Sequence, residues 1–153
     1  PTLPENLQYP LIIKPNSEGS SKGITQDSVV ETPEQALNKI DKLLSHYPSG
    51  LVVEEFIGGR ELSVPFIESF PGKLLDIVEH TFDLSRTGGK YNIYDYDMKQ
   101  GGEAAKSVNV ICPARISSQE EKAVIKMARE VFDIMSCPDV GRVDIRLHTN
   151  GKP

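Results

Sequence analysis

The chain alternates short apolar runs with two longer segments in which apolar residues recur at helical spacing. Short runs bounded by Gly, Pro and polar residues are typical of strands. The strands predicted in this way cover residues 11–13, 28–31, 51–57, 60–68, 74–81, 108–112 and 140–147. In the longer segments the apolar residues fall three and four positions apart, which indicates amphipathic helices.

Both predicted helices have a recognisable N-terminal signal. The first begins with Thr32-Pro33, an N-cap followed by proline at the first helical position, and its apolar residues continue to Leu44. The second follows the capping box Ser117–Glu120, and its apolar face reaches Met135. These signals locate the start of each helix more closely than the apolar pattern does.

Turn residues separate several of the strands. Phe70–Lys73 and Thr149–Lys152 read as hairpin turns, and Gly58-Gly59 reads as a hinge or turn. The mixture of strands, helices and hairpins predicts an α+β fold. One polar segment, 83–106, is rich in Gly and Tyr and is long for a connection in a compact domain, which is typical of functional or mobile loops.

Composition and charge narrow the classes of function. The 153 residues include 38% hydrophobic and 25% charged side chains, which excludes a fully disordered chain. The net charge of −5 argues against a protein that mainly wraps nucleic acid or coats anionic membranes, although a local basic pocket remains compatible with it. No run approaches a transmembrane length and residues 1–6 lack signal-peptide features, so we expect a cytoplasmic protein. Both cysteines, Cys112 and Cys137, are expected to be buried apolar thiols, with a reactive or paired role as the alternative.

The loop at residues 15–23 is the first candidate for chemistry. Its glycines let the backbone approach a ligand, and the hydroxyls of Ser20 and Ser21 with successive backbone N–H groups can hold phosphate oxygens. Lys14, at the end of the preceding strand, adds a positive charge at a fixed place. The spacing matches neither of the two familiar phosphate loops, and a flexible surface loop is the alternative.

The last predicted strand carries a second candidate. Alternation places Arg142, Asp144 and Arg146 on one face and Val143 and its apolar neighbours on the other. A carboxylate for Mg²⁺ beside a guanidinium for developing negative charge is the functional interpretation. A solvated salt-bridged face is the alternative.

Four further positions are weaker candidates on spacing alone. Glu54 and Phe56 share a face of their strand, and Glu61 lies just beyond the glycine pair, where a hinge can receive a flat base and a ribose. Lys99 is either a second phosphate cation or an exposed loop lysine. Ordinary edge-strand acids are the alternative for the two glutamates.

Six segments, taken together in their order along the chain, are more specific evidence of a family than any one segment alone. They are Tyr9-Pro-Leu-Ile-Ile-Lys-Pro15, Glu18-Gly-Ser-Ser-Lys-Gly23, Val53-Glu-Glu-Phe-Ile-Gly-Gly-Arg-Glu61, Tyr94-Asp-Tyr-Asp-Met-Lys99, Cys112-Pro-Ala114 and Gly141-Arg-Val-Asp144. Their order and spacing resemble the D-alanine–D-alanine ligase branch of the ATP-grasp family, from about residue 9 to the end of the chain.

The resemblance implies an ATP-grasp fold, in which two lobes with antiparallel sheets and packed helices clamp ATP. It assigns residues 1–57, with the phosphate loop 15–23, to the first lobe, and residues 58–153 to a second lobe that is truncated at its C-terminus. The implied enzyme is an ATP-dependent ligase of peptidoglycan precursor synthesis, and hence of cell wall biogenesis. It joins two D-alanines through an acyl phosphate and releases ADP and phosphate.

The resemblance also assigns residues. The positions implied to bind the nucleotide are Lys14, Ser20, Ser21, Glu54, Glu55, Phe56, Ile57, Glu61 and Lys99. Ser20 is also implied to act on the substrate, Arg142 to stabilise charge on the tetrahedral intermediate, and Asp144 to bind Mg²⁺ or Mn²⁺. The implied partners are small molecules, D-alanine foremost, with neither nucleic acid nor membrane, and the resemblance allows a homodimer of the full-length protein.

Two departures from the family pattern leave alternatives open. Gln100 stands where many members carry tyrosine, so another amino acid or a hydroxy acid remains an alternative second substrate. The sequence stops before the strand that completes the metal site in the family, and it lacks the N-terminal lobe that helps bind the first substrate. We therefore expect this piece to be the ATP-binding part, which alone turns over poorly or not at all. A non-catalytic nucleotide-binding module is the alternative from another class of function. What argues against it is that the chain retains Lys14, Lys99, Arg142 and Asp144.

Overall fold

The computed structural model describes residue 3 and residues 6–153. The chain divides into two compact units. The first unit runs to Phe56 and also contains Leu84–Ser107, and the second contains Ile57–Asp83 and Val108–Pro153. The polar segment 84–107 therefore lies in the first unit, whereas the sequence assigned it to the lobe 58–153.

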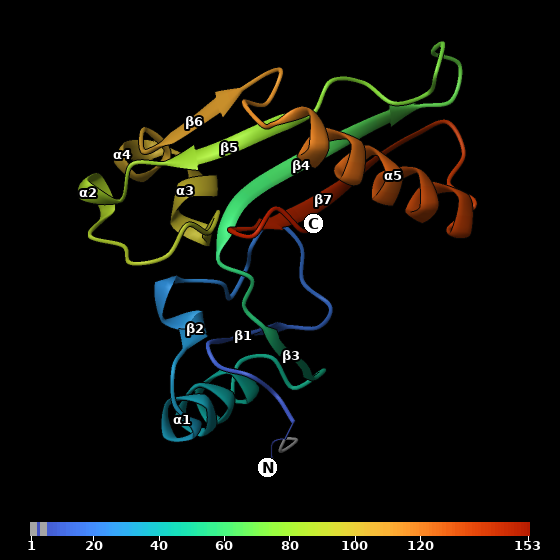
Figure 1. Ribbon diagram of the computed structural model, residues 1–153. Coiled ribbons are helices and arrows are strands. Elements are labelled where there is room, and N and C mark those ends of the chain that lie inside the picture. Colours follow the sequence, from blue (N-terminus) through green and yellow to red (C-terminus); the bar gives the residue numbers. More distant parts are fainter. Residues whose placement is uncertain (1–2, 4–5) are drawn as a thin grey trace. The chain divides into compact units, whose positions relative to one another are not determined.

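The first unit is built on a three-stranded antiparallel sheet with one long helix (Figure 1). Strand β1 (Leu11–Pro15) lies between β2 (Val29–Val30) and β3 (Leu51–Glu55). Helix α1 (Pro33–Leu44) packs against this sheet, and the Thr32 hydroxyl caps it by accepting from the Gln35 N–H. Its core consists of Leu11, Ile13, Val30, Ala36, Ile40 and Leu43.

The first unit also contains several short helices. A 3-10 turn, η1 (Gln26–Ser28), follows the loop 15–25. The segment 84–107 contains α2 (Leu84–Thr87), α3 (Tyr96–Gln100) and α4 (Gly102–Ala105). Among the residues that the structure describes, no helix is both long and apolar enough to cross a membrane.

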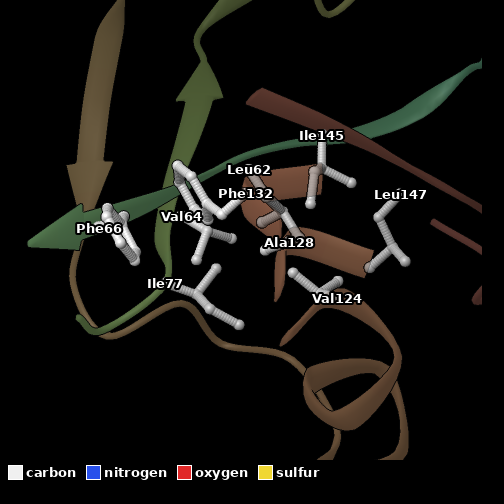
Figure 2. Packing of buried hydrophobic residues seen from close by; sticks show 9 residues of the cluster. All are labelled: Leu62, Val64, Phe66, Ile77, Val124, Ala128, Phe132, Ile145 and Leu147. Atoms are coloured by element: carbon white, nitrogen blue, oxygen red, sulfur yellow. The ribbon is translucent and has the colours of Figure 1, made fainter. Parts of the chain in front are cut away.

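The second unit is a four-stranded antiparallel sheet in the order β6-β5-β4-β7. Its strands are β4 (Gly59–Ile67), β5 (Val78–Phe82), β6 (Val108–Ile111) and β7 (Val140–His148). Helix α5 (Ser118–Ile134) lies along one face of the sheet. Figure 2 shows the buried side chains that join them: Leu62, Val64, Phe66, Ile77, Val124, Ala128, Phe132, Ile145 and Leu147.

The α+β class and the two antiparallel sheets are confirmed, and both helices begin where the capping signals predict. The strand predicted over 74–81 begins only at Val78. Its pairing with β4 stops at Ser63, two residues before Pro65, which has no N–H to add to the ladder. The strand predicted over 28–31 is shorter, because the Ser28 hydroxyl accepts from the Thr25 N–H and closes a helical turn first.

Two other expectations are corrected. The prediction of a buried Cys112 is wrong, because this thiol is exposed next to the end of β6, while Cys137 is half-buried. The segment 83–106 is not a plain loop but contains three short helices. Asp95 starts the middle one, α3, because its carboxylate accepts from the Met98 N–H at 3.1 Å.

The glycine pair gives a test of the fold. At Gly59, φ is +131° and an added Cβ would lie 2.2 Å from the Leu147 carbonyl oxygen, whereas at Gly58 an added Cβ meets nothing within 4 Å. We expect Gly59→Ala to cost about 2 kcal/mol or more, which lowers the melting temperature by roughly 4–8 °C. Gly58→Ala, the matched control, should change the stability by less than about 0.5 kcal/mol. Equal melting temperatures for the two variants would contradict this account of the start of β4.

Candidate functional site

The residues singled out from the sequence fall into two groups, one in each unit. The first unit contains Lys14, Ser20, Ser21, Glu54, Glu55, Phe56 and Lys99. The second contains Ile57, Glu61, Arg142 and Asp144. Each group is described within its own unit.

Lys14 and Glu54 lie on the same face of the first sheet. The side chains of Leu11 and Ile13 enter the core, so alternation places Lys14 on the opposite face of β1. In the register of β1 and β3, Lys14 pairs with Val52 and Ile12 with Glu54, and the Lys14 Nζ lies 2.5 Å from a Glu54 carboxylate oxygen. Both side chains are partly exposed, so this pair can open when an anion offers the ammonium a better partner.

The end of β3 is held by contacts on both sides. The Glu55 carboxylate accepts from the Gln8 N–H at 2.9 Å, and the Phe56 N–H donates to the Pro10 carbonyl at 2.8 Å. The Phe56 ring meets the Tyr91 ring edge to face, with centroids 5.5 Å apart. These contacts fix the backbone just before the chain leaves the first unit.

The loop 15–23 has a tightly folded backbone. Ser20 and Ser21 adopt left-handed conformations with φ of 53° and 57°, followed by Gly23 at 75°. Consecutive left-handed residues other than glycine cost about 1–2 kcal/mol each. The loop is braced by N–H donations from Lys22 to Gly19 and from Ile24 to Ser21. Strain of this kind is typical of ligand-binding loops.

The loop 15–23 contacts the segment that contains Lys99. The Ser21 hydroxyl donates to the Tyr94 carbonyl at 2.7 Å, and the Tyr96 N–H donates to the Ile24 carbonyl at 2.9 Å. The Lys99 Nζ lies 4.8 Å from the centre of the Tyr94 ring, a cation–π contact. The structure thus brings Ser21 and Lys99 to the same residue, Tyr94.

Gln26 strengthens this connection, a role that no motif of the sequence indicated. Its carboxamide oxygen accepts from the N–H groups of Lys90 and Tyr91, both at 3.0 Å. Its amide nitrogen donates to the Tyr91 carbonyl at 3.2 Å and to an Asp95 carboxylate oxygen at 3.4 Å. One side chain therefore ties the residues that follow the phosphate loop to residues 90–95.

Tyr91 also contacts Glu31, the residue that follows β2. Its hydroxyl donates to the Glu31 carboxylate at 2.9 Å, and the Lys90 ammonium reaches the same oxygen at 2.6 Å. The hydrogen bond from Lys90 and then that from Tyr91 lower the pKa of Glu31. Glu31 is therefore ionised at neutral pH and keeps both partners.

In the second unit, Arg142 and Asp144 project from the face of β7 opposite α5, as the alternation predicts. The guanidinium binds the carboxylate through two hydrogen bonds of 2.7 and 2.9 Å, and both side chains are more than half exposed. The Ser63 hydroxyl donates to the same carboxylate at 2.7 Å from the paired position on β4. The hydrogen bond with Asp144 raises the pKa of Arg142, so this arginine stays charged at any physiological pH.

Glu61 and Arg146 form a second pair on the same face. They are direct cross-strand partners, and an Arg146 Nη lies 3.1 Å from the Glu61 carboxylate. The Arg146 Nε donates to the Ile57 carbonyl at 3.0 Å. Burial lowers the pKa of Arg146, while the charge and the hydrogen bond of Glu61 act in the opposite direction.

The residues described here do not form a complete metal site. No group of three His, Cys, Asp or Glu side chains is placed to hold an ion within residues 3 and 6–153. Asp144 supplies one carboxylate, whose oxygens accept from Arg142 and Ser63. Mg²⁺ prefers six oxygens and commonly takes several from phosphates, so Asp144 fits as one ligand among others.

Comparison with known proteins decides the family. Residues 2–153, almost the whole chain, match the family described as D-ala D-ala ligase C-terminus. The chain belongs to this family. The ATP-grasp resemblance stated from the motifs is thereby confirmed.

Curated D-alanine–D-alanine ligases are among the relatives of this family member. The ligase of Methylacidiphilum infernorum is 33% identical over 144 residues, which are 94% of this chain and 42% of the relative. That of Mannheimia succiniciproducens is 29% identical over 147 residues, 96% of this chain and 42% of the relative. The chain therefore spans about two fifths of the length of these relatives.

Solved structures agree on the fold. The VanG D-Ala:D-Ser ligase of Enterococcus faecalis has a TM-score of 0.67 and 25% identity, and covers 96% of this chain and 39% of its own. The D-alanine–D-alanine ligase of Bacillus anthracis complexed with ATP has a TM-score of 0.66 and 18% identity, with 100% of this chain and 43% of its own covered. These matches identify the α+β fold of this chain as that of the ATP-grasp ligases.

The Gln26 contacts predict the dynamics of the segment 88–96. Gln26→Ala removes hydrogen bonds worth about 1 kcal/mol each, so we expect amide exchange in residues 88–96 to accelerate at least about tenfold. Gln119→Ala, the same change at an exposed position of α5, is the control and should leave these amides unaffected. Unchanged exchange in the Gln26 variant would show that other contacts hold the segment.

Proposed function

We propose that this chain is the ATP-binding part of an ATP-dependent ligase that joins two D-alanines for peptidoglycan synthesis. The observation that carries the proposal is the match of residues 2–153 to the ligase family, together with retained Lys14, Lys99, Arg142 and Asp144. D-alanine is proposed because curated relatives from several bacteria carry that activity in their names.

The proposed nucleotide contacts use both groups of residues. Lys14, Lys99 and the loop residues Ser20 and Ser21 bind the phosphates in this proposal. Glu54, Glu55, Phe56 and Ile57 hold the adenine, and Glu61 holds the ribose hydroxyls. Support comes from the partly exposed ammonium of Lys14, the strained serine backbone, and the shared contact of Ser21 and Lys99 with Tyr94.

The proposed chemistry has two steps. A carboxylate oxygen of the first D-alanine attacks the γ-phosphorus, the bond to ADP breaks, and an acyl phosphate forms. The amine of the second D-alanine then attacks the acyl carbon, inorganic phosphate leaves, and the amine loses a proton to the surroundings. Such transfers depend on positioning and on neutralising charge rather than on a covalent protein group.

Arg142 is proposed to stabilise the oxyanion of the tetrahedral intermediate, and Ser20 to close over the reacting groups. A guanidinium offers several N–H donors in a fixed plane, and pairing with Asp144 holds that plane in place. Bound Mg²⁺, held by Asp144 and by phosphate oxygens, would supply further neutralisation of the phosphate charge.

Gln100 favours a second candidate, a ligase of the same type with a different second substrate. Many family members carry tyrosine at this position, and Gln100 ends α3 directly after Lys99. A solved D-Ala:D-Ser ligase has the same fold, so the scaffold itself accommodates other second substrates. Acylation of D-serine or D-lactate would distinguish this candidate.

Nucleotide binding is tested by thermal shift with Mg-ATP. Ligand at roughly 100 times its dissociation constant stabilises by about 2.7 kcal/mol, which is roughly 5–10 °C for a chain of this size. We expect Lys14→Ala to lose most of this shift, and Lys126→Ala, which removes an exposed lysine of α5, to keep it. An equal shift in both variants would exclude Lys14 from the nucleotide site.

Ligase activity is tested on a protein of the relatives' full length that contains this chain. We expect ADP and phosphate release that depends on D-alanine, and none from this chain alone. Gln100→Tyr should alter the ratio of kcat/KM for D-alanine, D-serine and D-lactate while the KM for ATP stays within about twofold. ATP binding without substrate-dependent release would instead identify a non-catalytic module.

A further inference from the structure

On the face of the second sheet opposite α5, the charged side chains include a residue, Arg146, whose presence the family assignment does not explain. Glu61 on β4 has Arg146 as its direct partner on β7, and their side chains are only 22% and 23% exposed. Transferring a guanidinium out of water is costly unless it gains good partners. An apolar side chain would fill this place on β7 at lower cost, so the arginine requires another explanation.

Arg146 divides its hydrogen bonds between two different parts of the chain. One terminal nitrogen lies 3.1 Å from the Glu61 carboxylate, and Nε donates to the Ile57 carbonyl at 3.0 Å. Ile57 lies directly before the glycine pair, and Glu61 lies directly after Arg60 on β4. The rigid guanidinium plane therefore fixes the distance between the Ile57 backbone and the Glu61 carboxylate.

Fixing these two groups matters because of what each would bind. A carboxylate that accepts from two vicinal hydroxyls must hold both oxygens in a set orientation, and a free glutamate has three rotatable bonds to lose. The contact with Arg146 already orients that carboxylate before any ligand arrives. The same contact anchors the backbone position proposed to lie beside the base.

We propose that Arg146 is a positioning residue for the nucleoside, which holds the Glu61 carboxylate for the two ribose hydroxyls and the Ile57 carbonyl beside the adenine. This inference rests on the proposed function, since it needs ATP as the ligand. It adds a residue to which the sequence motifs assign no role. Arg146 itself does not touch the reacting atoms.

The test compares binding of ATP and 2′,3′-dideoxy-ATP to the whole chain by calorimetry with Mg²⁺ present. Hydrogen bonds to a charged carboxylate are stronger than those between neutral groups, so the wild type should prefer ATP by at least about tenfold. In Arg146→Met the affinity for ATP should fall and that for the dideoxy analogue should not, so that the preference drops below about threefold. A loss of affinity from general damage would affect both nucleotides equally.

Matched variants sharpen the comparison. Glu61→Gln should lose the same preference, and Arg146→Met combined with Glu61→Gln should be no worse than either alone, because the two residues act as one unit. Arg129→Met makes the same chemical change on exposed α5 and should keep the full preference. If Arg146→Met does not fold, Arg146→Lys decides the question, since it retains the charge but not two donors in one plane, and its preference should be reduced.

The outcomes separate the two proposals. An unchanged preference in the folded Arg146 variants overturns the positioning role and leaves ATP binding intact. A wild type that binds both nucleotides equally well also overturns the positioning role, because Glu61 then does not recognise the ribose hydroxyls. A wild type that binds neither nucleotide overturns the proposed function, and this inference with it.

Discussion

The antiparallel register between β4 and β7 is the constraint on which the second unit depends. It runs without a break from Gly59↔His148 to Ile67↔Val140 and sets Ser63 beside Asp144 and Glu61 beside Arg146. The residues between these partners, Leu62 and Ile145, point into the core. A slip by one residue would bury the charges and expose the core, so the packing of α5 and the functional face enforce the same register.

Charge pairs on both faces tie β4 to its two neighbours. On the face opposite α5, Glu61 holds Arg146 of β7. On the helix side, Arg60 binds Glu79 of β5 through two hydrogen bonds of 2.6 Å, and that carboxylate is almost completely buried. Breaking such a pair leaves an uncompensated charge, which costs more than the pair contributes when intact. The central strand therefore tolerates little movement, which suits a strand that presents Glu61 and Ser63.

In the first unit the two polar segments act as one body. Ser21, Ile24 and Gln26 all bond to residues 90–96, so the loop 15–23 and the segment with Lys99 are connected at several points. From the sequence, the phosphate loop 15–23 and the polar segment 83–106 were two separate candidate loops. The hydrogen bonds instead couple them, because a movement of either would strain the Ser21–Tyr94 and Gln26–Tyr91 contacts. In the proposed ligase, closure over the phosphates would thus move Lys99 together with the serines.

How much of the structure the sequence could predict depends on how far apart along the chain the interacting residues lie. Alternation along β7 depends on neighbouring residues, so it correctly set Arg142, Asp144 and Arg146 apart from the core, and N-terminal capping signals located both long helices. The Gln26–Tyr91 contact spans 65 positions and leaves no periodic trace, so no local pattern could reveal it. Arg146 was visible as a charge on the right face, but its partner Glu61 lies 85 positions away. The register of β4 against β7 is what places Arg146 beside Glu61, where its guanidinium can hold the carboxylate.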